Sequence, residues 1–92
     1  MLKLIGANVN IKDVKMGVGR FVKAKRKAEN LTQEQLAERL AISRITIQNL
    51  EAGKNFTMDT LLKVLQHFNL LSGLHQLIVS EVDAAENIES LY

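Results

Sequence analysis

One kind of helix start occurs three times in the chain, and its spacing limits the fold more than any other feature. Each start is a Ser or Thr that follows an apolar residue and precedes another apolar residue by four positions. The hydroxyl satisfies a free backbone N–H group, and the apolar pair fixes the direction in which the chain enters the helix. The three starts are Leu31-Thr32 with Leu36, Ile42-Ser43 with Ile47, and Phe56-Thr57 with Leu61.

The first two starts lie only eleven residues apart, so the first helix is predicted over residues 33–40, about two turns long. Gln35 completes a capping box with Thr32 at its beginning. A tight connection through Ala41 and Ile42 leads into a second helix from residue 44 to about 52, which stops at Gly53. This is the spacing of a helix-turn-helix.

Helical periodicity extends on both sides of this pair. We expect a helix over residues 13–28, a third start leading to a helix over 58–68, and a short fifth helix within 70–78. Residues 1–11 form either an arm or a strand, and the acidic residues 81–92 are expected to fray. The chain thus divides into an N-terminal segment (1–11), one helical domain (12–80) and an acidic tail (81–92). The predicted core holds Val18, Val22, Leu36, Ile47, Leu50, Leu61 and Leu65.

Composition excludes several classes of protein. The chain has no cysteine, which excludes a disulfide scaffold, a Cys-ligated zinc module and a thiol nucleophile. No run approaches the ~20 apolar residues of a membrane-spanning helix, and Leu2 to Ile5 is too short for a signal peptide, so we expect a cytoplasmic protein without a membrane partner.

The net charge of +2 is unevenly distributed. Residues 1–54 hold eleven of the twelve Lys and Arg residues against five acidic ones, a net charge of +6, whereas residues 55–92 carry −4. Five basic residues between 20 and 27 would attract a polyanion, although a charge run is more often a solvated helix face.

The run LTQEQLAERLAISRITIQNLEAGK, residues 31–54, resembles the lambda-repressor-like, Cro-type DNA-binding domains of the XRE family. Thr32-Gln33 opens the first helix of that motif, the small Ala37 follows four positions after the Gln, and Ile47 lies in the middle of the second helix. The ending Leu50-Glu51-Ala52-Gly53 is also typical. The resemblance implies an all-α, five-helix lambda-repressor-like DNA-binding domain.

In such motifs the second helix enters the major groove and the first crosses the DNA backbone. The resemblance implies that the base contacts are Ser43, Arg44, Ile45, Gln48 and Asn49. Arg44 is the strongest candidate because a guanidinium bonds guanine O6 and N7 bidentately, while Gln48 is equally well explained as a plain exposed residue. The implied phosphate contacts are Gln33, Thr46, Lys54, Thr57, Lys23, Lys25 and Lys27.

The resemblance also implies that two further residues have a structural role. Arg26 and Glu51 are expected to form an ion pair that joins the helix over 13–28 to the end of the recognition helix. Ala41 departs from the family pattern, which usually has glycine in the turn; if this residue is left-handed, alanine costs about 1 kcal/mol.

The expected function is a sequence-specific, autoregulatory transcriptional repressor that needs no cofactor or metal. An enzyme is not expected, because His67 and His75 are poorly placed for a metal, Glu34 and Glu38 look solvated, and no phosphate-binding glycine loop is present. Residues 68–78 and the acidic end weakly resemble HipB-like antitoxins, which implies a HipA-like kinase toxin as a second partner. The alternatives are a protein-interaction module that sequesters a partner and a phage-type, stand-alone repressor.

An apolar surplus follows the last predicted core helix and consists of Leu71, Leu74, Leu77 and Ile78. A homodimer would bury this surface and place two recognition helices on an inverted-repeat site in double-stranded DNA. In the alternative, Leu74 and Ile78 fold back onto the monomer.

Overall fold

Five helices build the protein, in a computed structural model that describes residues 8–90 and the side chains of residues 8–88. They are α1 (Ile11–Ala28), α2 (Gln33–Leu40), α3 (Arg44–Glu51), α4 (Met58–His67) and α5 (Leu71–Ser90). Among the described residues there is no strand, and no helix is long and apolar enough to cross a membrane. The all-α, five-helix prediction is confirmed.

The three predicted hydroxyl caps start α2, α3 and α4. Thr32, Ser43 and Thr57 each accept a hydrogen bond from the backbone N–H group three residues later, and Gln35 completes the capping box. Helix α1 begins two residues earlier than predicted, because Asn10 and Asp13 form a reciprocal capping box of their own. Residues 8–10 form no strand, and the remainder of the predicted arm or strand lies outside the described residues.

Helices α1 to α4 all end in the same way, with a residue in the left-handed region. These residues are Asn30, Ala41, Gly53 and Asn69, with φ of 58°, 56°, 73° and 61°. The N–H group of the residue after each one bonds a carbonyl five positions back, which satisfies a free acceptor at the helix end. Ala41 therefore adopts the conformation for which the related domains use glycine, and it bears the expected cost of about 1 kcal/mol.

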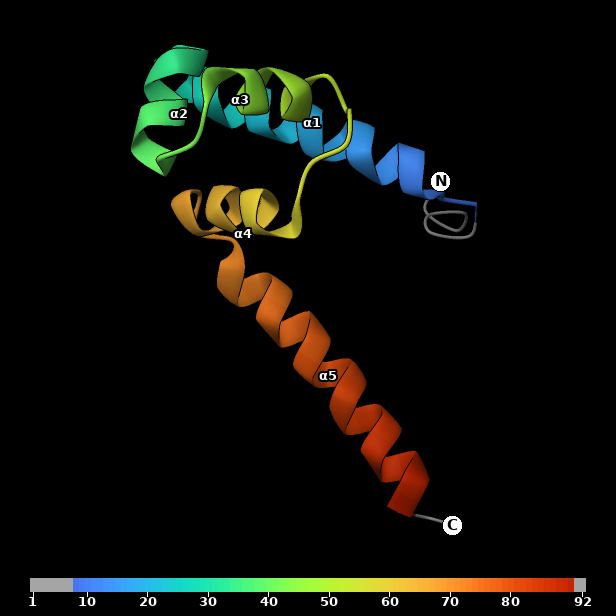
Figure 1. Cartoon of the computed structure of the whole chain (residues 1–92). Helices are drawn as coiled ribbons and strands as arrows, with labels where there is room; N and C mark the ends of the chain where they lie inside the picture. Colours follow the sequence, from blue (N-terminus) through green and yellow to red (C-terminus); the bar gives the residue numbers. More distant parts are fainter. Residues whose placement is uncertain (1–7, 91–92) are drawn as a thin grey trace.

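The core lies where α1, α2, α3 and α4 meet (Figure 1). Val22, Leu36, Ile47 and Leu50 are fully buried, as predicted. On α4, however, Val64 and Phe68 reach the core while Leu61 and Leu65 are only half-buried, and Val18 packs at the core's edge. Helix α4 is rotated in this way because its other side contacts the first turns of α5.

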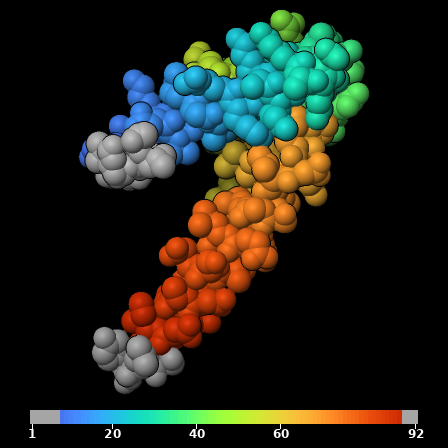
Figure 2. All heavy atoms as spheres, turned by 180° about the vertical axis from the view of Figure 1, so that it is seen from behind, coloured from blue at the N-terminus to red at the C-terminus, as the bar shows by residue number. Residues whose placement is uncertain are grey.

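Helix α5 projects away from the other helices (Figures 1 and 2). The radius of gyration is 16.0 Å, against about 12 Å for a compact chain of this length. The prediction that the chain frays from Glu81 is wrong, because α5 crosses the proposed boundary at residue 80 and continues to Ser90. No glycine or proline interrupts this stretch, and its alanines and glutamates favour a helix, so the acidic charge did not indicate disorder.

Two glycines in α1 have different structural meanings. A Cβ atom on Gly19 would lie 2.7 Å from the carbonyl oxygens of both Leu50 and Glu51, whereas a Cβ on Gly17 would meet nothing within 4 Å. Gly19 therefore allows α1 to approach the end of α3 closely, while Gly17 only weakens the helix.

We expect Gly19→Ala to lower the free energy of unfolding by about 1–3 kcal/mol, because neither carbonyl moves without shifting α3. The matched variant Gly17→Ala should raise the free energy of unfolding by about 0.5–1 kcal/mol, since alanine is the better helix former. Urea denaturation measures both values. Equal shifts of the same sign would contradict the close approach of α1 and α3.

Candidate nucleic-acid interface

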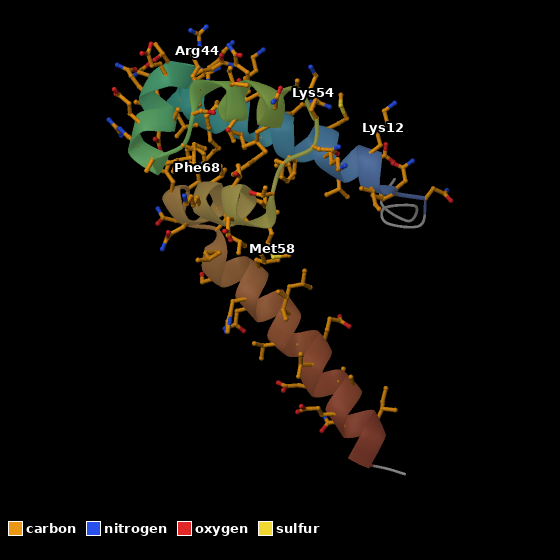
Figure 3. The ribbon with its side chains drawn as sticks, in the orientation of Figure 1. Lys12, Arg44, Lys54, Met58 and Phe68 are labelled. Carbon is orange, nitrogen blue, oxygen red and sulfur yellow. The ribbon has the colours of Figure 1, made fainter. Side chains whose placement is uncertain are left out.

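The beginning of α3 presents the side chains expected to read bases. Ser43, Arg44 and Ile45 are exposed, and Ile45 retains 66% of its accessible surface although it is apolar. Arg44 points away from the body of the protein (Figure 3). Gln48 and Asn49, one turn later, are half-buried. An exposed guanidinium beside an exposed aliphatic side chain provides a hydrogen-bond donor for guanine and an apolar contact for a thymine methyl group.

Gln48 and Arg44 lie one turn apart on the same side of α3. With the Gln48 amide oxygen turned toward Arg44, this oxygen lies 3.3 Å from both Nε and Nη2 of the guanidinium. Gln48 in this orientation can thus accept from Arg44, a contact that the sequence pattern alone did not indicate.

Thr46 is engaged within the protein. Its hydroxyl lies 2.8 Å from the Ser43 hydroxyl, and its backbone N–H group donates to Ser43 Oγ. Thr57 is engaged similarly, since its hydroxyl accepts from the backbone of Thr60 and donates to Thr60 Oγ1. The Thr57 hydroxyl caps α4, and the Thr46 hydroxyl is bonded to Ser43, the cap of α3. Lys54, in the loop between α3 and α4, is exposed and points outward (Figure 3).

A buried ion pair joins three helices below the exposed surface of α3. Arg26 of α1 donates from Nε to Glu51 Oε2 at 2.6 Å and from Nη2 to Glu51 Oε1 at 3.0 Å. Its Nη1 donates to the carbonyl of Leu31, just before α2. The two charged side chains expose only 10% and 5% of their surface. Arg26 therefore holds the end of α3 and the start of α2 on α1.

Gln33 also belongs to this network, since its Nε2 donates to Glu51 Oε1 at 3.0 Å. This places the predicted phosphate contact at the start of α2 in a fixed position. Burial by itself raises the pKa of the Glu51 carboxyl, but the hydrogen bonds from Arg26 and Gln33 outweigh it and the net effect is a lowered pKa. The hydrogen bond to Glu51 raises the pKa of Arg26.

The three lysines of α1 that were expected to attract DNA are not brought together. At 100° per residue, Lys23 and Lys27 project to one side of the helix and Lys25 to the opposite side. The charge of Lys23 acts on the Glu51 carboxylate and helps to lower its pKa. Of the three, only Lys23 and Lys27 therefore share a side of α1.

The two histidines have separate surroundings. His67 Nε2 lies 3.0 Å from Glu29 Oε1, linking the ends of α4 and α1, while His75 lines an apolar groove between α4 and α5. Within residues 8–88 no three His, Cys, Asp or Glu side chains are grouped closely enough to hold a metal ion.

The apolar surface predicted for dimerisation lies on α5. Leu71 and Leu74 are half-buried near α4, whereas Leu77 and Ile78 expose 60% and 53% of their surface. Of the two residues in the alternative that folds back onto the monomer, Leu74 is half-buried and Ile78 is half-exposed, and both line a groove with Leu62 of α4. The same side of α5 continues through Val82 and Ile88, both exposed, which were not recognised because the tail was expected to fray.

Comparisons with known proteins agree with this architecture. Residues 22–72, more than half of the chain, match a family described as helix-turn-helix. The chain is 37% identical over 73 residues to the HTH-type transcriptional activator BcrR of Enterococcus faecalis. This alignment covers 73% of the chain and 36% of the relative, so the chain corresponds to little more than a third of that protein's length. No solved structure matches the chain.

Removing the charge of Glu51 tests the network. We expect Glu51→Gln to lower the free energy of unfolding by about 3 kcal/mol at neutral pH, because Arg26 is left without its buried partner. The pKa of Glu51 is lowered from its ordinary 4.5 in the folded protein, so the stabilisation is fully present above pH 4.5 and is lost as the pH falls through the lower, folded value. Urea unfolding at a series of pH values measures it.

The matched control is Glu38→Gln, which removes a charge from an exposed position of α2. It should change stability little at any pH. A difference between the wild type and Glu51→Gln that stays constant through the acid range would contradict the assignment.

Proposed function

The chain belongs to the XRE-type helix-turn-helix family of DNA-binding transcriptional regulators, and we propose that it is a sequence-specific repressor. Its ligand is an inverted-repeat operator in double-stranded DNA, bound as a homodimer and located upstream of its own gene. The observation that carries the proposal is the exposed start of α3, where Arg44 and Ile45 project from a helix that a buried ion pair holds in place.

In this proposal the roles of the side chains follow from their surroundings. Arg44, oriented by Gln48, bonds a guanine, and Ile45 contacts a thymine methyl group, with Ser43 and Asn49 beside them. Gln33 and Lys54 anchor the phosphate backbone on the two sides of the groove. Thr57 acts through the start of α4, which it caps, and Thr46 acts through its hydrogen bonds to Ser43, the cap of α3. Lys23 and Lys27 add diffuse attraction.

Repression requires only that the bound protein occupies the promoter, without a surface that recruits RNA polymerase. The similar BcrR protein is named an activator, which supports activation as the second candidate. A reporter gene under the chain's own upstream region separates the two, because deletion of the protein raises expression under repression and lowers it under activation.

The apolar side of α5 is the proposed dimer interface. A helix of 20 residues is about 30 Å long, so two copies paired along it bury a continuous apolar strip. To bind two half-sites one turn of DNA apart, the dimer must hold its two α3 helices about 34–36 Å apart. The antitoxin alternative implies that a HipA-like kinase also binds this dimer. Co-purification of the two proteins tests that alternative.

We expect Arg44→Ala to reduce the preference for operator over random DNA by about 1–3 kcal/mol, because the variant no longer bonds a base. Lys54→Ala should weaken binding to both DNAs equally, because a phosphate contact carries no sequence information.

Binding of the wild type should depend on salt, with log K against log salt falling with a slope of roughly −4 to −5 for five phosphates per dimer. Fluorescence anisotropy at several salt concentrations measures all three. Equal losses on both DNAs for Arg44→Ala would refute the base contact.

Two charges on the exposed apolar side of α5 test the dimer. Leu77→Asp combined with Ile78→Asp should halve the mass measured by light scattering, because the charges repel and are costly to bury. Operator affinity should fall by more than tenfold, while the helical circular dichroism persists because both residues are already exposed in the single chain.

The control places the same two charges on the polar side of α5, as Ser72→Asp with Gln76→Asp, and should leave mass and affinity unchanged. A wild-type protein that is monomeric at micromolar concentration would overturn the dimer.

A further inference from the structure

We infer that the first two turns of α1 form an additional phosphate-binding surface, in which Lys12 and Lys15 contact the DNA backbone next to the phosphate held by Lys54. These two lysines precede the region that matches the helix-turn-helix family. The inference rests on the proposed DNA-binding function and extends its contact surface beyond the motif.

The packing of α1 against α3 determines where Lys12 lies. Lys12, Met16 and Gly19 fall on one side of the helix, since residues four and seven positions apart are nearly aligned. Gly19 lies directly against the last carbonyls of α3, and Met16 is so close to Gly53 that a Cβ there would be 2.6 Å from its sulfur. This side of α1 thus follows the end of α3 and the loop after it. Lys12 lies on this same side of α1, two turns before Gly19 and beyond the end of α3.

Lys15 joins this surface through the loop between α3 and α4. Its Nζ donates to Asn55 Oδ1 at 2.5 Å, across forty residues of sequence, and Asn55 directly follows Lys54. An ammonium group has three donors, so Lys15 keeps two for another acceptor. The hydrogen bond therefore fixes a positive charge next to the loop that carries Lys54.

Three of the basic side chains lie along one edge of the protein. Arg44, Lys54 and Lys12 come from α3, the loop and α1, and in Figure 3 they extend in the same direction from successive places along this edge. A DNA strand carries one phosphate per about 3.4 Å of helix axis, so a strand that passes Lys54 offers further phosphates to a row of this kind.

Asp13, the acidic residue in the first two turns of α1, does not neutralise the positive charge of this row of basic side chains. Asp13 accepts a hydrogen bond from the backbone of Asn10 at 3.1 Å and is used in the helix cap. On a helix it projects about 160° away from Lys15. The charge of the first two turns is therefore positive on the side that continues from α3, and the ligand that it fits is the phosphate backbone of double-stranded DNA.

The test is the variant Lys12→Gln with Lys15→Gln, compared with Arg39→Gln and Lys63→Gln, which line a hollow between α2 and α4 away from the row. We expect the first variant to bind operator and random DNA roughly tenfold more weakly, and each phosphate that the protein no longer binds should reduce the salt slope by about one. Hydroxyl-radical footprinting should show a shorter protected stretch of backbone. The second variant should retain the wild-type footprint, although it removes the same charge.

Replacing both lysines by arginine should restore affinity, slope and footprint. If the surface acted only through the Lys15–Asn55 hydrogen bond, the charge at position 12 would have no effect on binding. If Lys12→Gln with Lys15→Gln behaves like the control while Arg44→Ala and Lys54→Ala weaken binding, the inference is overturned and the proposed function stands. If Arg44→Ala and Lys54→Ala also leave binding unchanged, the proposed function fails and the inference fails with it.

Discussion

The buried pair between Arg26 and Glu51 is the interaction on which the arrangement of the helices depends. The guanidinium of Arg26 in α1 bonds the Glu51 carboxylate at the end of α3 and the carbonyl of Leu31, and the same carboxylate accepts a hydrogen bond from Gln33 at the start of α2. An isolated eight-residue helix is unstable in water, so α2 and α3 need such tertiary contacts to persist. The position of the exposed surface of α3 is thus set by the buried side chains of Arg26 and Glu51 beneath it.

The helix-turn-helix was predictable from the sequence because its signals are local. Each hydroxyl cap acts within four residues, so the starts of α2, α3 and α4 were correct to the residue. Asn10 and Asp13 carry a similar local signal, but the asparagine was not considered as a cap. The course of α5 beyond Glu81 was missed because acidic charge was taken as a sign of disorder, although the spacing of Val82 and Ile88 continued the apolar side of the helix.

The candidate site was predictable as a set of residues, but their contacts with one another were not. Glu51 Oε1 accepts from Gln33 across eighteen residues, and Lys15 reaches Asn55 across forty, so neither pair leaves a periodic trace in the sequence. The same holds for α4, whose rotation toward Val64 and Phe68 depends on having α5 on its other side. Local rules describe how each helix begins, whereas packing decides which side of it is used.

Helix α5 projects away from the other four helices, and this separation affects how such a regulator can evolve. Beyond its first turns this helix touches none of the buried side chains that support α3, so substitutions there leave the position of α3 within its own subunit intact. Conversely, a change at Arg44 or Ile45 does not reach the apolar side of α5. If α5 pairs the subunits and α3 reads the operator as proposed, partner choice and operator choice are separately mutable, and duplicated copies of such a gene would evolve insulated pairings while still reading the same DNA sequence.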